Sequence, residues 1–152
     1  MTDIERIATA IMLIPGGLWA GVVLFYAVER VNLWGRMPMD QYVVDFRRSL
    51  YRADPLQPIL AVVSMGGAIL FALKTEGTGS TLAWVAVALY VIVIAMSLAL
   101  PERINSQYRR RDEGDAPPDA EALRARWRVL HLTRTVPAMA ALVCLVLATT
   151  YV

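Results

Sequence analysis

The fold is decided by an uninterrupted apolar stretch at residues 82–100, LAWVAVALYVIVIAMSLAL, which contains no charged side chain. A helix of about 20 apolar residues is long enough to cross the hydrocarbon core of a bilayer. Three further runs of the same character lie at Ile7 to Val28, Leu56 to Leu73 and Val136 to Val152. The sequence therefore predicts four transmembrane helices.

The composition agrees with a small integral membrane protein. Of the 152 residues, 57% are hydrophobic and only 18% are charged, which leaves no segment for a separate soluble domain. The first run follows acidic Asp3 and Glu5 rather than a basic stretch, so we expect an uncleaved span and not a signal peptide. We predict a single membrane domain over residues 1–152, an all-α, up-and-down four-helix bundle.

The basic residues are distributed unevenly along the chain. Thirteen of the fifteen Lys and Arg side chains lie in two segments, residues 29–55 and 101–135. Because basic loops stay on the cytoplasmic side, we expect both loops in the cytoplasm, both termini outside, and the bacterial inner membrane as the location. We expect most of these arginines to bind anionic lipid headgroups, and nothing in the pattern favours a nucleic-acid partner.

The two loops contain helical patterns of their own. Val43, Phe46 and Leu50 recur at helical spacing and predict a short surface helix before Pro55, which rests on lipid or caps the bundle. In the second loop, a helix that begins near Ala120 has no breaker before the fourth span. This pattern predicts an extension of the fourth helix into the cytoplasm.

Small residues predict close helix contacts. Gly17-xxx-Gly21 in the first span favours a tight contact within the chain over a dimer face, although homo-oligomers remain compatible with the sequence. Gly66-Gly67 suggests a similar approach in the second span.

Polar residues converge on the cytoplasmic side. Trp127, His131 and Arg134 are spaced four and three apart, so they share one face of the fourth helix. His131, the only histidine, is the default candidate for proton transfer, and the alternative is a hydrogen-bonded structural residue. Likewise, Trp127 either contacts a ligand or anchors the helix at the membrane interface.

Two further groups belong to the same side of the membrane. Glu102, Asn105 and Arg109 share one side of a helix if that helix continues past Pro101. Glu29, three residues after Tyr26, either pairs with an arginine such as Arg134 or lies among the headgroups.

The sequence contains few residues of the types that bind metals or cofactors. One histidine and one cysteine, Cys144 inside the last span, rule out a zinc site of the usual type and an intrachain disulfide. We predict no metal site and no cofactor, while a weakly bound metal or a quinone remains open.

Several short motifs resemble those of the anthrone-oxygenase-like family of small four-span membrane proteins. The motifs are Ala20-Gly21-Val22, Met37-Pro38, Tyr51-Arg52-Ala53, Gln57-Pro58 and Trp127-xxx-His131-xx-Arg134-Thr135. The family commonly has Asn where this chain has His131, and it tends to place an Asn closer after the proline of the third span than Asn105 is after Pro101.

The resemblance implies a four-helix bundle that oxidises a lipophilic phenolic anthrone to a quinone with dioxygen, a monooxygenase-type reaction. His131 or Glu29 would be the base, and Arg134 would stabilise the anion. Trp127, Tyr26 and Trp34 would form the aromatic walls, and Glu102 and Asn105 would contact the substrate. Two other interpretations compete with the enzyme: a membrane scaffold or lipid-binding subunit that oligomerises, and small-molecule transport through an oligomer.

Overall fold

The computed structural model describes residues 2–152, and within this range the chain forms helices and no β-strand. The elements are α1 (Asp3–Phe25), the π-helical turn η1 (Tyr26–Arg30), α2 (Val31–Arg36), α3 (Met39–Arg52), α4 (Leu56–Lys74), α5 (Gly77–Ala99), α6 (Pro101–Arg109) and α7 (Ala120–Thr150).

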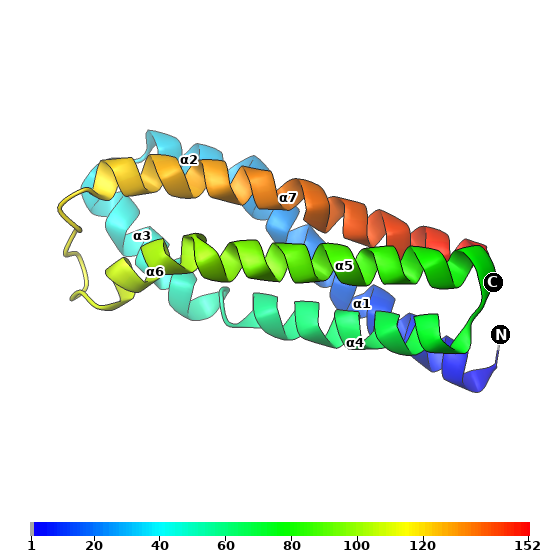
Figure 1. The fold of residues 1–152 in the computed structure, drawn as a ribbon. Coiled ribbons are helices and arrows are strands. Elements are labelled where there is room, and N and C mark those ends of the chain that lie inside the picture. The colour runs from blue at the N-terminus through cyan, green and yellow to red at the C-terminus, as the bar shows by residue number, and fades with distance from the viewer. Residues whose placement is uncertain (1) are drawn as a thin grey trace.

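Four long helices, α1, α4, α5 and α7, form an up-and-down bundle (Figure 1). Each helix packs against its neighbours in the order α1, α4, α5, α7 and back to α1, so α4 and α7 are diagonal to one another. Both termini lie at one end, which we call the terminal end. We call the opposite end, with α2, α3, α6 and the start of α7, the loop end.

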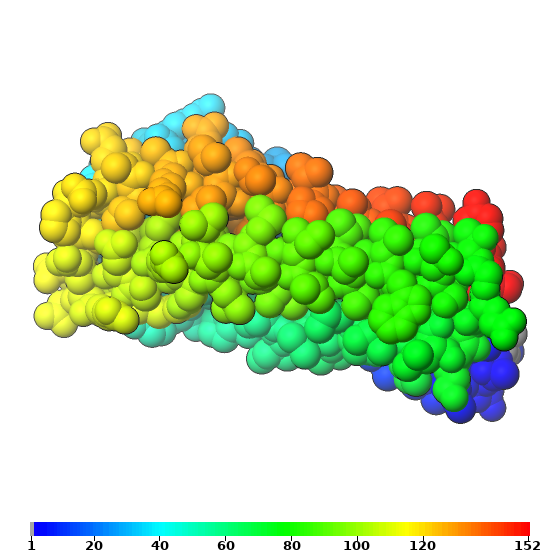
Figure 2. Space-filling view, in the orientation of Figure 1, coloured from blue at the N-terminus to red at the C-terminus, as the bar shows by residue number. Residues whose placement is uncertain are grey.

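The four predicted spans are confirmed as four helices long and apolar enough to cross a membrane. The space-filling view shows an elongated body with the residue 110–120 loop at one end and the termini at the other (Figure 2). Large apolar side chains are exposed along the length of these helices, for example Ile14, Leu18, Leu73, Val91 and Val136. Such a surface is stable in lipid and unusual for a soluble protein.

Glycines allow α1 and α4 to pack closely. Only some of the glycines predicted to lie at helix contacts do so. A Cβ atom at Gly67 would lie 2.6 Å from the backbone nitrogen of Met12, and one at Gly16 would lie 2.6 Å from Ser64 Oγ. The close approach at Gly66-Gly67 is therefore confirmed. The prediction of a contact within the chain at Gly17-xxx-Gly21 is wrong, because a Cβ at either glycine would have no neighbour within 4 Å.

The surface helix α3 caps the bundle. Its apolar face buries Tyr42, Val43, Phe46 and Leu50 against α6 and α7. Of the two positions that the sequence left open for this helix, the structure has the one against protein. The residues meet in a group that we call the aromatic cluster, formed by Tyr26, Trp34, Tyr42, Phe46, Tyr108 and Trp127.

Two irregularities shape the loop end. The first helix extends beyond its predicted end at Val28 through η1, a π-helical turn in which the Val31 N–H bonds to the Tyr26 carbonyl, into α2. The third helix does not run on through Pro101. It ends at Ala99, Leu100 has φ −126° and ψ −66°, and α6 begins with the proline, whose missing N–H costs nothing at a first helical position.

The fourth helix is longer than its predicted span, as the sequence indicates, while the side of the membrane on which it extends stays a prediction. The helix α7 runs without interruption from Ala120 to Thr150, so its first turns stand beyond the level at which the predicted span begins. Its face with Trp127, His131 and Arg134 is buried.

Candidate functional site

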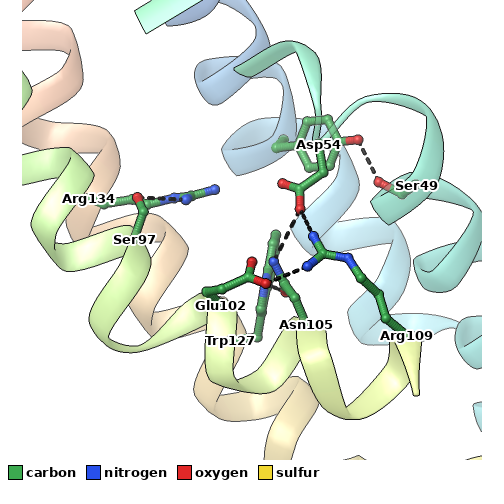
Figure 3. A network of polar contacts seen from close by, with 9 residues as sticks. Ser49, Asp54, Ser97, Glu102, Asn105, Arg109, Trp127 and Arg134 are labelled. Atoms are coloured by element: carbon green, nitrogen blue, oxygen red, sulfur yellow. Dashed lines mark hydrogen bonds and ion pairs between the residues drawn. The ribbon is translucent and has the colours of Figure 1, made fainter. Parts of the chain in front are cut away.

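A cavity of about 330 Å³ lies near the loop end. It is lined by α1, α4, α5, α6, α7 and the end of α3 with the turn that follows it. Its inner walls are apolar and include Trp19, Val23, Ala61, Val93 and Ile94. Its lining also includes a group of polar side chains that we call the polar rim: Asp54, Ser97, Glu102, Asn105, Arg109 and Arg134 (Figure 3). An apolar cavity with a few converging polar groups is the usual form of a small-molecule site.

Arg134 is the most buried cation of the polar rim, with 9% of its surface exposed. Its Nη1 donates to Ser97 Oγ at 3.0 Å, and its Nε and Nη2 donate to His131 Nδ1 at 3.3 and 3.0 Å. Within residues 2–152, no carboxylate lies within 4.0 Å of this guanidinium. Asp54 in the same cavity interacts with this guanidinium electrostatically but does not touch it, so Arg134 can still bond directly to an anionic oxygen of a ligand.

The hydrogen bonds of His131 define its tautomer. Nε2 is 3.1 Å from the Val23 carbonyl, which can only accept, and Nδ1 is bonded by a guanidinium, which can only donate. The ring therefore carries its proton on Nε2 and is neutral. It is fully buried and stacks on Trp127 with 4.8 Å between centroids and 11° between planes. His131 thus holds the Arg134 guanidinium in position on the side away from the cavity.

On the other side of the polar rim, Arg109 binds two carboxylates. Its Nη2 is 2.5 Å from Asp54 Oδ2, and its Nη1 pairs with Glu102. Asn105 Nδ2 donates to the same Asp54 oxygen at 3.4 Å, and Trp127 Nε1 donates to Asn105 Oδ1 at 3.0 Å. Asn105 therefore links Asp54 to the aromatic face of α7.

Asp54 is in the turn between α3 and α4, outside the membrane-spanning helix. Burial raises the pKa of its carboxyl above the ordinary value, although the guanidinium groups of Arg109 and Arg134 act to lower it. Burial dominates because a carboxylate loses hydration in the cavity.

The structure brings together some of the predicted site residues. Glu102, Asn105 and Arg134 line the cavity, and Arg109 joins them, so the predicted common side of the helix after Pro101 is confirmed. His131 lies directly behind Arg134.

Other predicted residues lie elsewhere. Tyr26, Trp34 and Trp127 belong to the aromatic cluster behind the cavity rather than to its walls, which include Trp19 and Tyr51 instead. Glu29 is exposed on η1, outside the cavity, and forms no ion pair with Arg134.

Asp54 is a site residue that the sequence reasoning missed. Pro55 predicts the end of the surface helix, and that interpretation gives the neighbouring Asp54 no role in a site. Its signal was an ionisable residue at the predicted start of a span, on the same side of the membrane as the other polar groups. Within residues 2–152, no three His, Cys, Asp or Glu side chains lie close enough to hold a metal ion.

Four membrane-spanning helices around a cavity with a polar rim define a small integral membrane protein with a candidate ligand site at one end. The profile of a family described as anthrone oxygenase matches residues 46–144, which is well over half of the chain. The chain belongs to this family. The matched segment contains every residue of the polar rim as well as Trp127 and His131. No curated protein and no solved structure matches the chain.

Proposed function

We propose that the protein is a membrane oxygenase that converts a lipophilic phenolic anthrone to the corresponding quinone with dioxygen. The observation that carries the proposal is Arg134, a nearly buried guanidinium that lines an apolar cavity and is in direct contact with no carboxylate. Family membership supports the same reaction class. Small-molecule cavities range from about 300 to 1,000 Å³, so a cavity of about 330 Å³ suits a compact ligand.

The reaction makes modest demands on the protein. Deprotonation of an anthrone gives an electron-rich enolate, which can transfer an electron to dioxygen. The protein then has to bind the aromatic rings, accept a proton and stabilise the oxyanion. The apolar walls accommodate the rings, and the two Arg134 N–H groups not used by Ser97 and His131 are available for the oxyanion.

We further propose that the loop end faces the cytoplasm of a bacterial cell, because thirteen of the fifteen basic residues belong to the segments that form or adjoin it. Reporter fusions at both termini would test this orientation. Reporters active only outside the cytoplasm support it, and reporters active only in the cytoplasm contradict it.

The central experiment compares quinone formation by the purified protein in lipid nanodiscs with that in empty nanodiscs, using 1,8-dihydroxyanthrone and an oxygen electrode. Arg134→Gln should lower kcat/KM by about 100- to 1,000-fold, the usual effect of removing an oxyanion donor. Arg128→Gln, an exposed position on the same helix, is the matched control and should retain activity.

The alternative scaffold function predicts a different result. Wild-type protein would then form quinone no faster than empty nanodiscs, and native mass spectrometry would find anionic lipid bound through Arg134. That outcome would overturn the oxygenase proposal.

A further inference from the structure

We propose that Asp54 is the catalytic base of this cavity and removes a proton from the ring methylene of a bound anthrone whose carbonyl oxygen contacts Arg134. This inference rests on the proposed function, because it assigns the proton acceptor of that reaction.

Asp54 has one carboxylate oxygen in use and one free for a ligand. Both hydrogen-bond partners, Arg109 Nη2 at 2.5 Å and Asn105 Nδ2 at 3.4 Å, bond to Oδ2. Within residues 2–152, Oδ1 has no hydrogen-bond partner, and Figure 3 shows the carboxylate directed into the space toward Arg134. Oδ1 can therefore accept a proton while Oδ2 keeps both contacts.

The bundle places Asp54 and Arg134 on opposite sides of the cavity. Asp54 precedes α4, Arg134 belongs to α7, and these two helices are diagonal in the packing order. Both side chains line the same cavity. In an anthrone, the carbonyl and the methylene are at opposite edges of the central ring. A substrate that directs its oxygen at Arg134 therefore directs its methylene toward Asp54.

The other candidate bases are less suitable. The Nδ1 lone pair of His131 accepts from Arg134, and its Nε2 donates to Val23, so the ring has no free acceptor. Glu29 is exposed and outside the cavity. Glu102 does line the cavity, but its side chain is 40% exposed compared with 23% for Asp54, so water competes for it more strongly.

Burial also makes Asp54 a stronger base than an ordinary aspartate. It raises the pKa of this carboxyl above its usual value despite the two neighbouring guanidinium groups. A carboxylate with a raised pKa removes carbon-bound protons more readily.

The proposed sequence of steps conserves atoms and electrons. The methylene C–H bond breaks, the proton binds Asp54 Oδ1, and the electron pair moves into the ring system to form the enolate at Arg134. The enolate gives one electron to dioxygen, and the resulting radical and superoxide combine in a C–O bond. Asp54 returns its proton to the peroxide, and loss of water, with the second methylene proton, leaves the quinone carbonyl.

An anaerobic experiment isolates the first step, because without dioxygen the enolate accumulates. Full-length protein in nanodiscs is mixed with 1,8-dihydroxyanthrone, and the enolate is followed by its absorbance in a stopped-flow instrument. Asp54→Asn should form the enolate at least 100-fold more slowly than wild type, which is the lower range for general-base catalysis. Binding, measured by quenching of tryptophan fluorescence, should persist, and added formate should restore part of the rate.

Asp40→Asn is the matched control, because Asp40 is exposed on α3 and should leave the rate unchanged. A wild-type rate of enolate formation in folded Asp54→Asn overturns this inference and leaves the oxygenase proposal intact. If Asp54→Asn does not fold, Asp54→Glu is measured instead. Its carboxylate oxygen is displaced, so it should form the enolate at least tenfold more slowly than wild type. A wild-type rate in Asp54→Glu would overturn the inference. No quinone formation by wild-type protein overturns both proposals together.

Discussion

The two ends of the bundle are packed on different principles. At the terminal end and through the middle, the core consists mainly of small residues and aliphatic side chains, with the separate rings of Trp19, Phe71 and Tyr90 among them. Its buried hydroxyl pair, Ser64 and Tyr90, is satisfied by hydrogen bonds of 2.6 and 2.7 Å. At the loop end, bulky aromatic rings support a cavity whose rim includes a guanidinium that touches no carboxylate. The comparison indicates that one end stabilises the fold and that the other holds the polar groups available to a ligand.

Among substitutions that test this difference between the two ends, Gly67→Ala should have the largest effect, a loss of stability. The added Cβ would lie 2.6 Å from Met12 N and 2.8 Å from the Ile11 carbonyl carbon, both backbone atoms that cannot rotate away. We expect a loss of about 3 kcal/mol or more, at the upper end for overpacking. Thermal unfolding in detergent measures the loss. Gly66→Ala, where a Cβ meets nothing within 4 Å, should leave the melting temperature within a few degrees, and an equal loss there would contradict the explanation.

His131→Ala should have the next largest effect, a loss of activity. It leaves the Nε and Nη2 of Arg134 without their acceptor, and hydrogen bonds to charged groups contribute about 1.5 to 3 kcal/mol. We expect a 10- to 100-fold fall in kcat/KM, measured as quinone formation. His131→Asn, which keeps an acceptor in this region, should lose less activity than His131→Ala. Similar losses in both variants would show that His131 does more than position Arg134.

Tyr90→Phe tests the middle of the core. It removes the hydroxyl bonded to Ser64 at 2.7 Å and keeps the ring that packs on Trp19. We expect a loss of about 1 kcal/mol in stability, the net value of one hydrogen bond, with kcat/KM unchanged. A large fall in kcat/KM without loss of stability would remove the distinction between the two ends.

The smallest effect should come from Trp127→Phe. The ring contact with His131 is retained, and only the hydrogen bond to Asn105 is lost. A fall in kcat/KM of about threefold is expected from a neutral hydrogen bond at the low end of its range. Trp84→Phe on the exposed surface of α5 is the control and should not change kcat/KM.

The sequence predicts the architecture well because membrane helices follow from local hydropathy. The spacing of Trp127, His131 and Arg134 also predicts their common face, since helical periodicity is local. Asp54 is different. Its role depends on Arg109, which is 55 positions later in the chain, and the sequence near either residue does not predict their contact.

The remaining errors also have physical causes. Gly16 and Gly17 are adjacent, and the spacing motif alone does not tell which of them faces a neighbouring helix. Glu29 does not line the cavity, and its exposed position is one of the two that the sequence left open.

The π-helical turn at Tyr26–Arg30 has a consequence for the evolution of this protein. Such a turn holds one residue more than an α-helical turn, so it can absorb an inserted residue without rotating the part of the helix that follows. A single-residue deletion there that restores ordinary winding would therefore leave Trp34 directed at Trp127 and Phe46, which it now contacts at 5.4 and 5.1 Å between ring centroids. One added codon in an ancestral gene would thus be tolerated at this point without disturbing the cap.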